Sequence, residues 1–101
     1  MPAAALDPVI HAALRLQICA ILMQAEVVDF ATVREMLDVS ESVLSKHVKV
    51  LDEAGYVAIR KSPADGRVRT SLALTGAGRR AFRAHARSLR TLVGDPDLAA
   101  E

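Results

Sequence analysis

Residues 40–57 read SESVLSKHVKVLDEAGYV, a segment that opens on a serine and reaches a glycine near its end. Leu44, Val48 and Leu51 recur at the spacing of one helix face, which predicts an amphipathic helix with its apolar side against a core. The opening serine is suited to cap the first turn, and Gly55 is a typical residue just beyond a helix end. The segment therefore predicts a capped helix that ends near Gly55.

Two more helices and a short strand are expected before this segment. Residues 7–24 carry apolar side chains at helical spacing, and the stripe is wide enough either for a buried core helix or for contact with another subunit. Residues 27–30 alternate over a length that suits only an edge strand. Thr32 and Glu35 have capping-box spacing, so they predict the start of a helix of two to three turns.

A hairpin and a final helix are expected after it. Residues 56–61 and 67–74 have β-like content, and Ser-Pro-Ala-Asp-Gly at 62–66 supplies the turn between them. Thr75 is suited to cap a helix that runs to about Val93. The order helix, strand, helix, helix, strand, strand, helix predicts a mainly helical α+β fold of the winged helix-turn-helix type.

The length of 101 residues fits a single domain, with a core over about 7–93 and a disordered tail over 94–101. Polar residues interrupt every apolar stretch before it reaches the length of a membrane span. The first residues show no secretory signal pattern, and the lone Cys19 has no partner for an intramolecular disulfide. We therefore expect a cytoplasmic protein with no membrane contact.

Charge is segregated along the chain although the net charge is only +1. Residues 40–90 hold 11 Lys and Arg against four Asp and Glu, a net +7, and the remainder holds two against eight, a net −6. Segregation of this kind produces a local positive field that a polyanion senses. Double-stranded DNA is therefore a candidate partner.

Three segments resemble the winged-helix transcription regulators of the MarR and ArsR kind, most closely their small single-domain relatives. They are residues 30–40, residues 44–57 and residues 72–79, and the resemblance as a whole covers about residues 6–93. The resemblance implies sequence-specific DNA binding and transcriptional regulation, typically repression. It also implies a homodimer formed through the first and last helices, which would place two modules on successive half-sites.

The helix over 41–54 is the expected recognition helix, because a helix supported by another after a tight turn presents one face to the major groove. With three apolar positions directed inward, the outward positions are Ser42, Val43, Lys46 and Lys49, with Glu41 and Ser45 toward the helix start. His47 lies between the two faces, so a DNA contact and a structural role stay open for it. The candidate contact residues are Ser42, Val43, Ser45, Lys46, His47 and Lys49.

The hairpin is the expected wing, with cations on both sides of its Pro- and Gly-containing tip. Arginine suits the backbone or a narrow minor groove. The Asp65-Gly66-Arg67 tip is similar to the Asp-x-Arg wing of MarR-like regulators, which implies that the arginine reaches DNA and the aspartate shapes the wing. A plain solvated hairpin is the alternative. The candidate wing residues are Arg60, Lys61, Asp65, Gly66, Arg67 and Arg69.

Other classes of function find less support. His11, His47, His85 and Cys19 are scattered along the sequence, so neither a metal site nor any other cofactor is expected. The glycines at 76–78 are only a fragment of a phosphate-binding loop, so no catalytic residues and no enzymatic activity are expected. A winged helix that binds protein instead of DNA is the alternative function. The residues identify no small-molecule effector.

Overall fold

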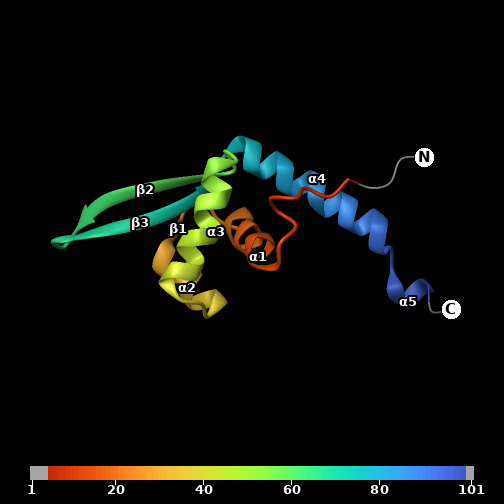
Figure 1. The fold of residues 1–101 in the computed structure, drawn as a ribbon, viewed down its shortest axis with the longest axis horizontal. Coiled ribbons are helices and arrows are strands. Elements are labelled where there is room, and N and C mark those ends of the chain that lie inside the picture. The colour runs from red at the N-terminus through yellow and green to blue at the C-terminus, as the bar shows by residue number, and fades with distance from the viewer. Residues whose placement is uncertain (1–4, 100–101) are drawn as a thin grey trace.

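The computed structural model describes residues 5–99 and confirms the predicted winged helix arrangement (Figure 1). The elements in chain order are α1 (Ala13–Met23), β1 (Val28–Asp29), α2 (Phe30–Leu37), α3 (Glu41–Glu53), β2 (Val57–Ala64), β3 (Arg67–Leu74), α4 (Gly76–Val93) and α5 (Pro96–Ala99). The three strands form one antiparallel sheet in the order β1-β3-β2.

The molecule is elongated, with extents of 58 × 25 × 22 Å. Figure 1 shows α1, α2 and α3 grouped in a central body, with the β2–β3 hairpin and α4 projecting from it in opposite directions. The short helix α5 lies within the segment expected to be a disordered tail. The domain boundary proposed from the sequence stays a prediction.

The core lies where α1, α2 and α3 meet the base of the hairpin. Leu44, Val48 and Leu51 are all buried, which confirms the inward face predicted for α3. Burial of such side chains contributes roughly 1.5–3 kcal/mol each and is the main source of stability in a domain of this size. The other buried apolar residues are Ile10, Ile18, Cys19, Leu22, Val33, Val57, Leu72 and Leu74.

The first helix begins later than predicted, at Ala13 instead of Asp7. The Asp7 carboxylate accepts hydrogen bonds from the backbone N–H groups of Val9 and Ile10, which forms a turn, and Ala12 is extended. An aspartate side chain that bonds nearby backbone groups competes with helix formation. The turn directs Ile10 into the core, where it is completely buried.

The start of α2 also differs from the prediction. The helix begins at Phe30, with Asp29 in the N-cap position and no side-chain cap hydrogen bond, so the capping box proposed at Thr32 is wrong. Val28 and Asp29 pair with Leu72 and Ser71 of β3, and the chain therefore passes directly from the sheet into the helix. Tertiary pairing has overridden the local capping signal.

Local signals are correct at both ends of α3. The Ser40 hydroxyl accepts a hydrogen bond of 3.2 Å from the backbone N–H of Val43, which satisfies a donor of the first helical turn. The chain leaves the helix at Ala54, and Gly55 then adopts a φ of 79°, which a residue without Cβ tolerates best.

The hairpin turn is shorter than the five residues expected from the sequence. Strands β2 and β3 pair without a break from Val57↔Leu74 to Ala64↔Arg67, which leaves only Asp65 and Gly66 in the turn. Both have positive φ, 50° and 76°, as a two-residue turn matched to the strand twist requires. The two strands are therefore paired over a greater length than the sequence predicted, and the turn between them is tighter.

Helix α4 starts against the end of α3. Thr75 caps it by accepting a hydrogen bond of 2.9 Å from the Gly78 N–H, and the Thr75 hydroxyl donates to the Gly55 carbonyl. Gly78 is buried so closely on Tyr56 that a Cβ there would lie 2.0 Å from the Tyr56 carbonyl oxygen. The angle at which α4 leaves the body depends on this contact.

A polar cluster connects the N-terminal segment to α4. The Tyr56 hydroxyl donates a 2.7 Å hydrogen bond to the Asp7 carboxylate, and the Asp7 backbone N–H donates a 3.0 Å bond to Nδ1 of His85. Burial raises the pKa of the Asp7 carboxyl, but hydrogen bonds from Tyr56, Ile10 and Val9 and the nearby His85 outweigh it and lower the pKa below 3.8. The cluster joins three segments that are distant in the sequence.

His85 lies at the centre of this cluster, with its Nδ1 as a hydrogen-bond acceptor. It is 1% exposed, and its Nε2 has no hydrogen-bond partner among residues 5–99. Burial, with a smaller effect from the neighbouring His11, lowers the pKa of His85 below 6.5, while Asp7 opposes the shift. Because Nδ1 already accepts the Asp7 N–H, protonation there would break that hydrogen bond.

We expect Gly78→Ala to destabilise the protein by about 3 kcal/mol, because backbone cannot move out of the way of the new methyl group. Urea unfolding measures the change. Gly76→Ala is the matched control, since its Cβ meets only the flexible end of Arg80 and alanine favours a helix. Equal stability of the two variants would contradict the close contact.

We expect the free energy of unfolding to fall as the pH drops below 6.5. As the pH falls, His85 is protonated in the unfolded chain before it is protonated in the folded chain. The contribution of His85 to stability is therefore fully present above pH 6.5 and is lost as the pH falls below that value. Unfolding curves of wild type and His85→Leu at several pH values isolate this contribution from that of His47, whose pKa is also lowered. The same pH slope in both proteins would contradict the assignment.

Candidate nucleic-acid interface

The outer face of α3 presents five of the six predicted recognition residues to solvent. Burial of the opposite face fixes the rotation of the helix, so side chains between the buried positions point outward. Val43 is an exposed apolar residue among polar neighbours. The exposed candidates are Ser42, Val43, Ser45, Lys46 and Lys49.

His47 differs from the other candidates because it packs against the body. It is half-buried, and its Nδ1 lies 3.1 Å from an Arg15 guanidinium nitrogen of α1. The same guanidinium donates to the Val9 carbonyl. Burial, together with the charges of Arg15 and Lys46, lowers the pKa of His47. This contact ties α3 to α1, and the sequence offered no signal that Arg15 would provide it.

The wing, comprising β2, β3 and their turn, divides its cations between two faces. Arg60 pairs with Ser71 and Lys61 with Thr70 in the ladder, and successive residues of a strand point to opposite faces. Arg60, Arg67 and Arg69 therefore share one face, and Lys61 lies on the other, which faces α3. The candidate cations of the wing therefore do not all share one face of the hairpin.

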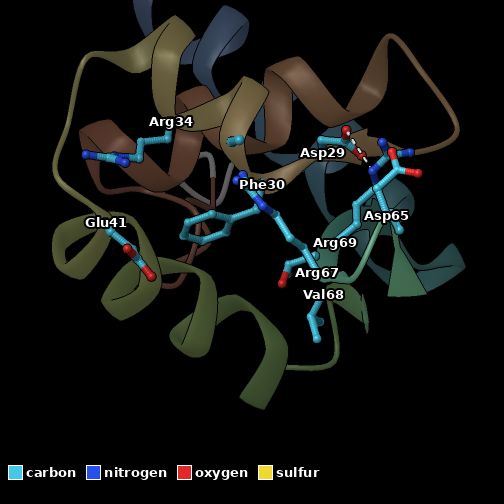
Figure 2. Close-up of a pocket in the computed structure, with 11 residues that line it drawn as sticks. Asp29, Phe30, Arg34, Glu41, Asp65, Arg67, Val68 and Arg69 are labelled. Atoms are coloured by element: carbon cyan, nitrogen blue, oxygen red, sulfur yellow. Dashed lines mark ion pairs between the residues drawn. The ribbon is translucent and has the colours of Figure 1, made fainter. Parts of the chain in front are cut away.

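Arg69 is partly committed to a contact within the protein. Its Nε lies 3.7 Å from the Asp29 carboxylate at the start of α2, as Figure 2 shows, and both side chains are substantially exposed. An exposed pair of this kind contributes at most about 1 kcal/mol. Arg67 is exposed at the tip and makes no ion pair within residues 5–99, so its charge is available to a partner.

The wing tip takes its shape from its backbone. Asp65 adopts a positive φ, which aspartate tolerates better than most residues, and the φ of Gly66 is positive as well. Both residues are exposed. The shaping role that the resemblance implied for the aspartate stays a prediction.

Two hollows lie between the wing and the helices. One of about 700 Å³ lies between the start of α2 and the β3 side of the wing, and its lining includes Arg34, Arg67 and Arg69 (Figure 2). The other, of about 280 Å³, lies between α3 and the wing, with Lys49 and Lys61 on its sides. A concave surface with cations along its sides is suited to a polyanion.

Carboxylates also line these hollows, although none of them is among the residues predicted to contact DNA except Asp65. Glu41 borders both hollows, Asp52 the smaller one, and Asp29 and Asp65 the larger one. Carboxylates repel phosphate but accept hydrogen bonds from the N4 amino group of cytosine. The sequence contains a signal for the two carboxylates of α3. Residues 41, 45, 49 and 52 recur at intervals of three and four, which places Glu41 and Asp52 on the same helix face as Lys49.

Little in the described part of the chain suggests a metal site or a membrane segment. No group of three or more His, Cys, Asp or Glu residues among 5–99 is arranged to hold a metal ion. His11 and His85, distant in sequence, nevertheless lie with ring centroids 5.3 Å apart. None of the described helices is long and apolar enough to cross a membrane.

Comparison with known proteins identifies relatives by sequence and by structure. Residues 14–93 match the family model described as winged helix DNA-binding domain. An uncharacterized protein of Methanocaldococcus jannaschii is 35% identical over 75 residues, which cover 74% of this chain and 82% of that protein.

Solved structures extend the similarity. A transcriptional regulator homologue of Pyrococcus horikoshii superposes with a TM-score of 0.80 at 27% identity and covers 84% of each chain. The PcaV transcriptional regulator of Streptomyces coelicolor superposes with a TM-score of 0.65 at 24% identity, over 96% of this chain and 68% of its own.

Proposed function

Because this chain belongs to the winged helix DNA-binding domain family, we propose that it binds double-stranded DNA sequence-specifically as a homodimer and regulates transcription, in the simplest case by repression. Helix α3 enters the major groove, and the wing contacts the backbone or the minor groove. The observation that carries this proposal is the exposed polar face of α3 beside a projecting cationic hairpin.

The two lysines of α3 have the positions required for phosphate or guanine contacts. Lys46 and Lys49 are exposed, one turn apart, on a helix whose opposite face is buried. The hydroxyls of Ser42 and Ser45 donate to phosphates or bases, and Val43 is placed for contact with a thymine methyl group. His47 has the role of orienting α3 through Arg15.

Dimerisation is supported by apolar residues at the far end of α4. Leu92 and Val93 are 59% and 60% exposed, on the part of the helix that projects from the body in Figure 1. In the proposed dimer, a second copy of the chain covers these two residues. Helix α1 forms the rest of the dimer interface. Two modules related by two-fold symmetry then bind half-sites about one helical turn apart.

A titration of a mixed-sequence duplex, followed by fluorescence anisotropy at low and moderate salt, tests the proposal before the operator is known. Affinity that falls steeply with salt, with two chains bound per duplex at saturation, is the expected result. Absence of binding at low salt would contradict DNA binding and leave a protein partner as the explanation.

We expect Lys46→Ala/Lys49→Ala to weaken DNA binding at least tenfold, since roughly 1–3 kcal/mol accompanies each good base contact. The melting temperature should change little because both side chains are exposed. Anisotropy titration and thermal unfolding measure the two effects. Unaltered affinity would remove α3 from the recognition role.

We expect Arg67→Ala to lower affinity for all sequences and to reduce the slope of log K against log salt by about 1 per chain. Arg69→Ala is the matched control on the same face. Its effect on the slope should be smaller because Asp29 already partly neutralises that guanidinium. A larger effect at Arg69 than at Arg67 would contradict the proposed position of DNA along the wing.

A further inference from the structure

The outer face of α4 carries a row of four exposed arginines. This row is separate from the candidate DNA contacts on α3 and the wing. Arg80, Arg83, Arg87 and Arg90 follow one another at intervals of three, four and three residues, which places them on one side of the helix. The row extends for about 15 Å along the helix axis. It lies on the element that projects away from the wing in Figure 1.

No carboxylate on α4 balances the positive charge of this row, because the chain contains no Asp or Glu between Asp65 and Asp95. The ion pair between Arg69 and Asp29 involves none of the four arginines. Like charges at these spacings repel one another and destabilise a helix. Arg90, in the last turn, is stabilised by the negative end of the helix dipole, but Arg80 and Arg83 are not.

The opposite face of α4 is already occupied. His85 is buried and Phe82 is half-buried, where the helix packs on α1 and β3. Leu92, two residues after Arg90, also points away from the row, whereas Val93, three residues after Arg90, borders the end of the row. The four arginines are therefore exposed in the single chain, and only Arg90 lies within one turn of the apolar residues proposed for the dimer contact.

We propose that this row is a second, sequence-independent DNA-binding surface, which holds the phosphate backbone of duplex beyond the segment contacted by α3 and the wing. The proposal rests on the proposed DNA binding but assigns a surface with a separate role. It would lengthen the DNA segment held by each chain without adding base recognition.

The chemistry of the row favours a phosphate backbone over other polyanions. Guanidinium groups bind phosphate oxygens in a bidentate manner, and one DNA strand presents a phosphate about every 3.4 Å of its axis, so several lie opposite a row of this length. An anionic membrane fits poorly, because an interfacial helix inserts its apolar face and that of α4 is packed against the domain.

The test compares wild type, Arg83→Gln/Arg87→Gln and Arg83→Lys/Arg87→Lys on duplexes of two lengths. A duplex of about 20 base pairs accommodates two half-sites, and one of about 50 base pairs adds flanking DNA on each side. On the long duplex the Gln variant should reduce the slope of log K against log salt by about 2 per chain, and the Lys variant should retain most of it. All three proteins should bind the short duplex alike.

Identical slopes for the three proteins on the long duplex would overturn the proposal and leave an acidic protein as the occupant of the row. Equal losses by the Gln variant on both duplexes would also overturn it, since the row would then belong to the primary interface. Either result leaves the proposed function standing if wild type binds the short duplex in a salt-dependent manner. Failure of wild type to bind either duplex would instead overturn both.

Discussion

Burial of Leu44, Val48 and Leu51 is the contact on which the rest of the structure depends. These side chains fix the rotation of α3 on the body, so every other residue of the helix receives its direction from them. The same burial brings the end of α3 against the start of α4, where Tyr56 and Gly78 are in backbone contact. The candidate recognition face and the direction of the projecting helix follow from one packed core.

Polar contacts then orient the segments that the core alone would leave free. Asp7 connects the N-terminal segment to Tyr56 and His85, and Arg15 connects α1 to His47. Each contact joins residues at least 30 positions apart in the sequence. A small apolar core supplies only modest stability. These polar contacts therefore help to hold the helices in one arrangement.

The distribution of charge divides the surface by role. Lys49 and Lys61 lie along the sides of the hollow between α3 and the wing, and Glu41 and Asp52 also line it. In the proposed complex, the cations hold the backbone and the carboxylates discriminate among bases or exclude misplaced phosphates. The arginines of α4 are uniform in sign and carry no such mixture, which suits contact without sequence preference.

The sequence by itself determined the order of the elements, the inward face of α3, the caps at Ser40 and Thr75 and the presence of a cationic hairpin. These features depend on residues a few positions apart, where periodicity and capping chemistry act directly. Only the tertiary structure decided the late start of α1, the start of α2 at Phe30 and the division of wing cations between two faces. Those features depend on strand register and on contacts between distant residues, for which a single sequence contains no local signal.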